Sequence, residues 1–211
     1  MTAILGPEIE IREAGALDGL DREQISQLAP GPGDAVLVTR LADGTAVRVA
    51  ERRISPLLQE KVAELFAAGV PVVVLLCTGE FPDFPIPVPA SDSSLSGRLL
   101  LRPQPLLHHV MQALATSLKL GVVVPAAEQI EEARQRWRGV GREQVVSAAS
   151  PYESKAQLVQ AAQGLAEAGV DVVVLDCIGY TFAMQELFRR TVGVPVILAR
   201  GVVSRILGEI A

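Results

Sequence analysis

Two cysteines, the only ones in the chain, are the residues whose type and position best suit catalysis. Cys77 and Cys177 each stand near the end of the same stretch of sequence, because residues 63–80 (AELFAAGVPVVVLLCTGE) and 163–180 (QGLAEAGVDVVVLDCIGY) are identical at ten of eighteen positions without a gap. A thiolate can accept a proton and a thiol can donate one. Two such groups on opposite faces of a small substrate could remove an α-proton from one side and deliver one to the other. The stereocentre would then invert without a cofactor.

A glycine follows each cysteine two residues later, in Thr78-Gly79 and Ile178-Gly179. Glycine lets the backbone turn so that successive N–H groups point toward a ligand, and such a nest holds a carboxylate or an enolate. We therefore predict that these four residues bind the substrate, and that this partner is a small anionic molecule.

Other interpretations of the two cysteines are open from the residues alone. Each could be a buried thiol that acts as a small hydrophobic side chain. The pair could be a redox-sensing dithiol, which requires Cα atoms within about 7 Å. The same scaffold could also bind a small molecule without catalysis, in a regulatory role. The repeat favours catalysis or ligand contact, because chance seldom places the only two cysteines at equivalent positions.

Four further residues could contribute to a site. Arg40 follows an expected strand, where its guanidinium could bind a carboxylate in bidentate fashion or pair with Asp43. Gln129 lies near an expected helix start, and Tyr180 could donate a hydrogen bond to substrate or pack in the core. Asp176 should point to the opposite side of its strand from Cys177, as a structural carboxylate that needs a buried partner.

Alternating strands and helices must position these residues. Strands are expected at residues 8–12, 35–39, 46–49, 70–76, 120–124, 144–148, 170–176 and 194–198, and helices at 21–28, 56–68, 106–117, 127–138, 154–168, 182–192 and 202–210. This alternation is typical of parallel βαβ units, and the continuously apolar runs Val72–Leu75 and Val172–Leu175 indicate strands buried on both faces. Asp43-Gly44 predicts a hairpin turn. Gly69 and Gly169 each predict the end of a helix.

The repeat predicts two similar half-structures, with a boundary near Gly97–Arg102. A proline- and serine-rich segment, Phe81–Gly97, begins four residues after Cys77. Loops of this length in compact domains are usually lids, binding loops or linkers.

Composition narrows the class of protein. The net charge of −5 argues against nucleic acid as a partner, and the cluster Arg134, Arg136, Arg138 is interpreted as a solvated helix face. The longest apolar run of interest, Val70–Cys77, is too short for a membrane span of about 20 residues. No signal peptide is recognised, so a cytoplasmic location with reduced thiols is expected. Neither the cysteine spacing nor the adjacent His108 and His109 forms a metal motif, so no metal site is predicted.

Several motifs resemble the AroM family. They are GALDGL at residues 15–20, LVTRLADGT at 37–45, LLCTGEFP at 75–82, GVVVP at 121–125 with the following Gln129 and Trp137, and LDCIGY at 175–180. They occur in the family's order and cover nearly the whole chain. More distantly, the two-cysteine arrangement resembles the aspartate/glutamate/hydantoin racemase superfamily, whose two bases match Cys77 and Cys177.

The resemblance implies an α/β fold of two pseudo-symmetric flavodoxin-like lobes with parallel sheets and a site between them. It implies that residues 1–99 with 200–211 form the lobe carrying Cys77, and residues 100–199 the lobe carrying Cys177. The implied activity is cofactor-independent racemisation, isomerisation or decarboxylation, on a small carboxylate or a hydantoin-like compound.

The sequence departs from this pattern in two places. By this pattern the chain starts after the first strand of the first lobe, so we expect an upstream coding start, another segment, or a second copy in a homo-oligomer to fill that place. Gly179-Tyr180 stands where amino-acid racemases have a histidine after the second cysteine. This second departure argues against a simple glutamate or aspartate racemase.

Overall fold

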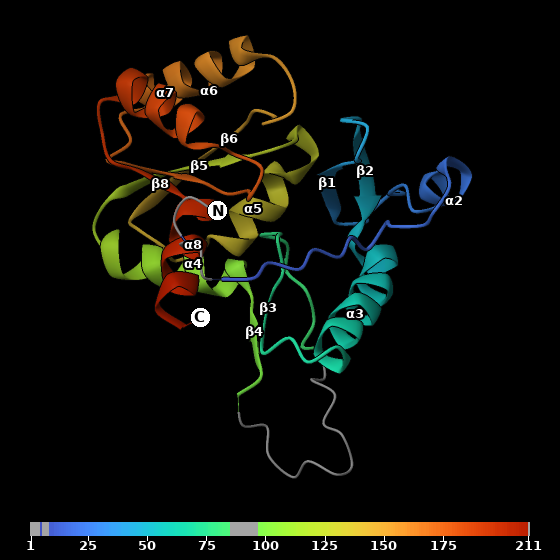
Figure 1. Ribbon diagram of the computed structural model, residues 1–211. Coiled ribbons are helices and arrows are strands. Elements are labelled where there is room, and N and C mark those ends of the chain that lie inside the picture. Colours follow the sequence, from blue (N-terminus) through green and yellow to red (C-terminus); the bar gives the residue numbers. More distant parts are fainter. Residues whose placement is uncertain (1–4, 6–8, 85–96, 211) are drawn as a thin grey trace. The chain divides into compact units, whose positions relative to one another are not determined.

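The computed structural model describes residue 5 and residues 9–84 and 97–210. Its contacts divide the chain between Arg102 and Pro103 into two compact units (Figure 1). We call Ile9–Arg102 the N-terminal unit and the part from Pro103 onward the C-terminal unit. The lobe bounds expected from the resemblance stay a prediction.

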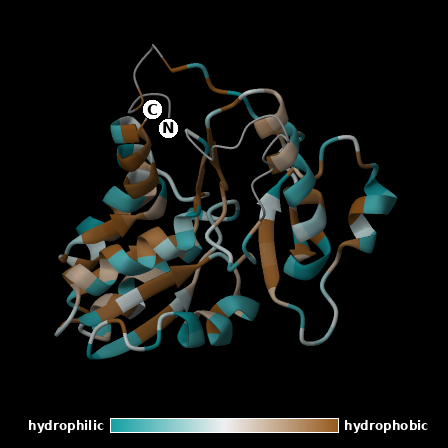
Figure 2. Ribbon diagram, turned by 90° about the horizontal axis from the view of Figure 1, so that it is seen from below, coloured by the Kyte–Doolittle hydropathy of each residue, from teal (hydrophilic) through white to brown (hydrophobic). Residues whose placement is uncertain are grey.

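The C-terminal unit is built on a four-stranded parallel sheet. Its strands are β5 (Lys119–Val124), β6 (Glu143–Ala148), β7 (Val172–Leu175) and β8 (Val196–Leu198), in the order β6-β5-β7-β8. This is the flavodoxin-like order, in which the chain moves outward in opposite directions from the two central strands. β7 and β8 consist entirely of hydrophobic residues, whereas β6 also contains Glu143, Gln144 and Ser147. Figure 2 shows brown, hydrophobic strand segments between helices of mixed character.

Helices cover both faces of this sheet. They are α4 (Pro103–Leu114), the short 3-10 helix η1 (Ala127–Gln129), α5 (Ile130–Arg136), α6 (Lys155–Glu167), α7 (Phe182–Val192) and α8 (Ala199–Ile210). Figure 1 shows α6 and α7 on one face and α4, α5 and α8 on the other. Val173, Leu165 and Phe188 are fully buried in the core between the sheet and the α6–α7 layer. Each helix that follows a strand starts at the carboxyl edge of the sheet, so its N-terminal N–H groups lie at that edge.

The N-terminal unit holds smaller sheets. Its elements are α2 (Arg22–Gln27), β1 (Val36–Arg40), β2 (Ala46–Ala50), α3 (Glu51–Ala67), β3 (Val72–Val74) and β4 (Leu99–Leu101). β1 and β2 form an antiparallel hairpin, whereas β3 and β4 form a parallel pair. Phe66 of α3 packs on Val73 in one core cluster, and Leu37 packs with Val49 and Ile54 in another.

Most of the predicted elements are confirmed, together with the α/β class. The hairpin turns at Asp43-Gly44, with φ of +87° at the glycine, and Gly69 and Gly169 take positive φ just after α3 and α6. The expected strand at residues 8–12 is wrong, since Ile9–Arg12 has no regular secondary structure and residue 8 lies outside the described part. Residues 85–96 of the predicted loop also lie outside it. The missing first strand stays a prediction.

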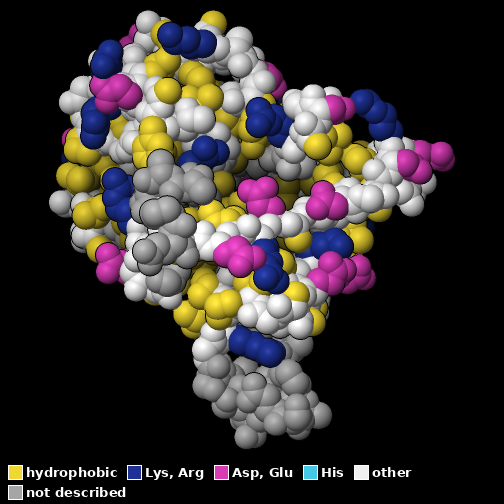
Figure 3. All heavy atoms as spheres, in the orientation of Figure 1, with side chains coloured by type: hydrophobic (Ala, Val, Ile, Leu, Met, Phe, Trp, Pro, Cys, Tyr) yellow, Lys and Arg dark blue, Asp and Glu magenta, His cyan; other side chains and the backbone are white. Residues whose placement is uncertain are grey.

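The face of the molecule drawn in Figure 3 carries charges of both signs. On the face drawn in Figure 3, Lys and Arg side chains lie interspersed with Asp and Glu side chains. No helix within the described residues combines the length and the apolar character needed to cross a lipid bilayer.

Candidate functional site

The turn after β7 carries Cys177 at the carboxyl edge of the parallel sheet. β7 and its neighbour β5 are the two central strands, where the winding direction changes. In open α/β sheets ligands bind in the crevice outside the strand ends at such a point. The backbone N–H of Asp176 donates to the carbonyl of Val123 at 2.9 Å, which ties the end of β7 to β5 just before the cysteine.

The Cys177 turn is closed by its own hydrogen bonds. The N–H of Gly179 donates to Sγ of Cys177 at 3.3 Å, and the N–H of Tyr180 donates to the carbonyl of Cys177 at 3.4 Å. α7 then begins at Phe182, capped by the hydroxyl of Thr181. An N–H group aimed at sulfur stabilises the thiolate, because hydrogen bonding to a charged form favours that form.

Gly179 lies where a side chain would collide. A Cβ built on it would stand 2.8 Å from Cζ of Tyr152 and 2.9 Å from Cγ of Pro151, and would also contact the Tyr152 hydroxyl. The loop after β6 therefore approaches the backbone of the turn directly. Glycine is required here by close approach.

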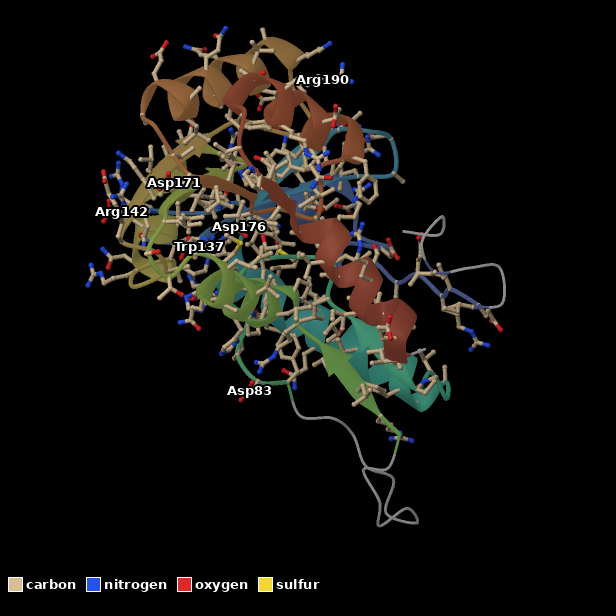
Figure 4. All side chains as sticks on the ribbon, turned by 90° about the vertical axis from the view of Figure 1, so that its left-hand side faces the viewer. Asp83, Trp137, Arg142, Asp171, Asp176 and Arg190 are labelled. Carbon is tan, nitrogen blue, oxygen red and sulfur yellow. The ribbon has the colours of Figure 1, made fainter. Side chains whose placement is uncertain are left out.

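Asp176, immediately before Cys177, is a buried carboxylate with two partners. Its Oδ2 accepts from Nη2 of Arg136 at 2.9 Å and from Nε1 of Trp137 at 2.8 Å. Figure 4 labels Asp176 and Trp137. The side chains of Asp176 and Arg136 are only 1% and 6% exposed. The buried partner expected for this carboxylate is thus present. The solvated interpretation of the arginine cluster holds for Arg134, which is 57% exposed, but is wrong for Arg136.

Tyr180 is fully buried and its hydroxyl donates to the carbonyl of Ala149 at 2.6 Å. Burial raises the pKa of this hydroxyl well above its usual value, and the nearby charges of Cys177 and Asp176 add to the rise. Tyr180 therefore stays protonated at neutral pH. Its bond to Ala149 links the turn after β7 to the end of β6, which supports the packing role over a contact with substrate.

Arg200, near the start of α8, reaches back to the same turn. Its Nε donates to the carbonyl of Ile178 at 2.9 Å, and its Nη2 lies 3.5 Å from the carbonyl of Gly179. Both partners are neutral backbone oxygens. The guanidinium therefore brings a positive charge to the residues that follow Cys177.

The Cys77 turn of the N-terminal unit has the same local contact. The N–H of Gly79 donates to Sγ of Cys77 at 3.4 Å, and Cys77 packs against the cluster that includes Leu37. Thr78 is buried. The equivalent glycine is also crowded, because a Cβ on Gly79 would stand 2.8 Å from Cδ2 of Leu37.

The remaining predicted residues lie at element ends. Arg40 is the exposed last residue of β1, and Asp43, the partner considered for it, accepts from Nη2 of Arg22 at 2.8 Å. Oε1 of Gln129 accepts from the N–H of Ala126 at 3.0 Å and so caps η1, which follows β5. Gln129 thus lies at the carboxyl edge of the sheet, as Cys177 does. Substrate binding by Arg40 and Gln129 stays a prediction.

Seven of the nine predicted site residues lie in two turns, Cys77–Gly79 and Cys177–Tyr180, whereas Arg40 and Gln129 lie outside them. Sequence reasoning missed the side chains that hold the second turn, namely Tyr152, Arg136, Trp137 and Arg200. One signal was present: a carboxylate in an otherwise apolar strand end requires a cationic or N–H partner. Both cysteine side chains are partly buried. In the described parts of the chain, no three His, Cys, Asp or Glu side chains gather where a metal ion could sit.

Comparison with known proteins places this geometry in a family. Allantoin racemase from Klebsiella pneumoniae has a similar structure, with a TM-score of 0.52 and 14% sequence identity over 76% of this chain and 67% of that chain. Picrophilus torridus aspartate racemase gives a TM-score of 0.44 and 10% identity over 74% and 68% of the two chains. Curated protein sequences give no match. The sequence profile described as AroM protein matches residues 1–211, and the chain therefore belongs to the AroM family, on a racemase-like α/β scaffold.

Proposed function

We propose that this protein is a cofactor-independent racemase or isomerase that moves an α-proton on a small carboxylate or hydantoin-like substrate. Cys77 and Cys177 act as the paired acid and base. The protein is proposed to work in the cytoplasm, where thiols stay reduced.

One observation carries the proposal: the two cysteines have the same local structure around them. Each follows a parallel strand, and each Sγ accepts a hydrogen bond from the glycine N–H two residues later, at 3.4 Å for Cys77 and 3.3 Å for Cys177. A buried structural thiol needs no such donor, whereas a thiolate gains from it. That the chain builds this arrangement twice supports a role for both sulfurs.

The reaction uses the two thiols in opposite states. The thiolate removes the α-proton from one face of the substrate, and the electron pair passes into the neighbouring carbonyl to form an enolate. The thiol on the other face donates its proton to the carbon, and the two sulfurs exchange protonation states. Backbone N–H groups near the two turns and at the helix starts stabilise the enolate oxygen. The reaction requires that both sulfurs reach one carbon.

Deuterium exchange tests the proposal. The folded protein is incubated in D2O with a panel of α-substituted carboxylates and hydantoins, and α-deuterium is followed by mass spectrometry. We expect exchange with inversion for at least one substrate. Cys77→Ser and Cys177→Ser should each lose turnover by about 100-fold or more, as is typical when a general acid or base is removed.

Binding measurements separate catalysis from simple ligand recognition. A compound that raises the melting temperature equally in the wild type and in both serine variants, with no exchange in any of them, would identify a non-catalytic binding protein. Exchange that survives in both single variants would remove the cysteines from the mechanism.

A further inference from the structure

We infer that Arg200 is a positioning residue that controls the charge state of Cys177 through the Ile178–Gly179 peptide. Only the use of the Cys177 thiolate as a base rests on the proposed function. The effect of Arg200 on Cys177 rests on a series of hydrogen bonds that connects the guanidinium to the sulfur.

The contact chain has three links. The Arg200 guanidinium donates to the carbonyl oxygen of Ile178 at 2.9 Å. The next link is the peptide bond itself, whose N–H belongs to Gly179. That N–H donates to Sγ of Cys177 at 3.3 Å.

The geometry of the Ile178–Gly179 peptide determines how Arg200 can affect the sulfur of Cys177. The described residues contain no cis peptide bond, and in a trans peptide the C=O and N–H groups point in opposite directions. Arg200 and Sγ of Cys177 therefore lie at opposite edges of the same peptide unit. The cation cannot touch the sulfur by this route. It polarises the peptide, because hydrogen bonds in series strengthen one another, and so makes the Gly179 N–H a better donor to a thiolate.

Arg200 also holds the turn in shape. Its Nη2 lies 3.5 Å from the carbonyl of Gly179, the residue whose N–H must point at the sulfur. No carboxylate pairs with Arg200 among the ion pairs of the described residues, so its charge is not cancelled locally. A guanidinium stays protonated across the working pH range.

The other charged and titratable groups around the turn leave this effect in place. Asp176, the carboxylate next to Cys177 in the chain, pairs with Arg136 and accepts a hydrogen bond from the indole N–H of Trp137. Burial keeps the Tyr180 hydroxyl protonated. Tyr152 packs on Gly179. Arg200 is thus the cation that the Ile178–Gly179 peptide presents to Cys177.

The pH dependence of cysteine alkylation tests the inference without any substrate. Iodoacetamide reacts with the thiolate, so its rate against pH follows the thiolate fraction. In a Cys77→Ser background we expect Arg200→Gln to slow alkylation of Cys177 roughly threefold to tenfold at neutral pH, because a charge acting through one peptide is partly screened. At high pH the rate should reach the same plateau as with Arg200 present.

Matched variants separate this role from simple support. Arg205 lies on the same helix, and among the described residues its hydrogen bond is to the carbonyl of Gly201 within that helix. Arg205→Gln therefore removes the same charge without touching the turn. It should leave the profile unchanged. Arg200→Lys keeps a cation and should displace the profile less than Arg200→Gln. Circular dichroism checks the fold of each variant, and Arg200→Lys carries the test where Arg200→Gln fails to fold.

Three results would overturn the inference. The Arg200 variants could react as the wild type does at every pH. Arg205→Gln could displace the profile as far as Arg200→Gln, which would indicate a general charge effect. The plateau could fall with no displacement along the pH axis, which would indicate altered access alone. Loss of racemisation would not bear on the inference, because alkylation is read in the absence of substrate.

Discussion

The Cys77 and Cys177 turns share a sequence and a local hydrogen bond, yet they differ in what supports them. Cys177 follows a strand that has a parallel neighbour on each side, in a four-stranded sheet. Cys77 follows β3, which forms a two-stranded sheet with β4. The Cys177 turn is further held by Asp176, Tyr180 and Arg200, whereas the Cys77 turn packs against the apolar side chains of Leu37 and Phe81.

This difference shows that the residues shared by the two halves determine the local structure, whereas the residues that differ determine the contacts around it. The shared residues fix the helix end, the strand and the Cys-x-Gly turn, and these form in both units. The residues that brace the Cys177 turn occur at positions where the first half has other side chains: Asp176 corresponds to Leu76, and Tyr180 to Glu80. Each such pair of positions offers a matched experiment.

The largest difference in stability between the two turns is expected from truncating the residue before each cysteine, Asp176 or Leu76. Asp176→Ala leaves the Arg136 guanidinium buried without this partner, and breaking a buried ion pair costs about 3 kcal/mol or more. Urea denaturation of the isolated variant should therefore show a large loss of free energy of unfolding. The bond from Arg136 to Glu132 reduces the loss without removing it.

Leu76→Ala is the matched control. Leu76 is 55% exposed, and truncation of an exposed side chain changes stability by about 0.5 kcal/mol. Equal losses from the two variants would contradict the view that Asp176 anchors its turn and Leu76 does not.

The second largest difference is expected in the stability cost of replacing the two turn glycines, Gly179 and Gly79, by alanine. Gly179→Ala drives a methyl group against the ring of Tyr152 and the ring of Pro151, which are stiff, and overpacking of this kind costs about 1–3 kcal/mol. Gly79→Ala meets mainly Cδ2 of Leu37, the end of a flexible side chain, so its cost should stay below about 1 kcal/mol. Thermal melts of the two variants compare them directly. A larger cost at Gly79 would reverse the comparison.

Local signals made much of this fold predictable from the sequence. The hairpin at Asp43-Gly44 and the helix ends at Gly69 and Gly169 depend on φ angles that glycine adopts most easily, so a single residue type reveals them. The helix at Phe182–Val192 was predicted with its observed bounds, because a polar N-cap and a following glycine mark its two ends. The repeat itself located both cysteine turns.

The rest depends on contacts between residues far apart in the chain. Arg136 binds Asp176 across 40 residues, and Arg200 binds Ile178 across 22. Nothing in the local sequence distinguishes the buried Arg136 from the exposed Arg134 two residues away. Strand β4 was missed for a related reason, since three residues acquire strand structure only by pairing with β3. The sequence therefore predicted the two cysteines of the candidate site, but it did not predict the side chains that hold the Cys177 turn.

The smallest and most specific difference concerns Tyr180. Tyr180→Phe removes the hydroxyl that donates to Ala149, and the loss of one buried hydrogen bond should lower stability by about 1–2 kcal/mol at neutral pH. The folded protein raises the pKa of this hydroxyl, whereas in the unfolded chain it ionises near pH 10. The contribution of Tyr180 is thus fully present below about pH 10 and is lost as the pH rises toward the folded pKa. Above about pH 10 the free energies of unfolding of the wild type and of Tyr180→Phe should approach each other by up to about 1.4 kcal/mol per pH unit.

Urea denaturation at about pH 7 and about pH 11 measures this convergence. Glu80→Gln, at the equivalent exposed position of the other turn, should change stability by less than about 0.5 kcal/mol at both values. A constant gap between the wild type and Tyr180→Phe across this range would mean that the hydroxyl ionises as easily in the folded protein as in the unfolded chain. The Cys177 turn would then be open to water, and its surroundings would resemble those of an exposed loop.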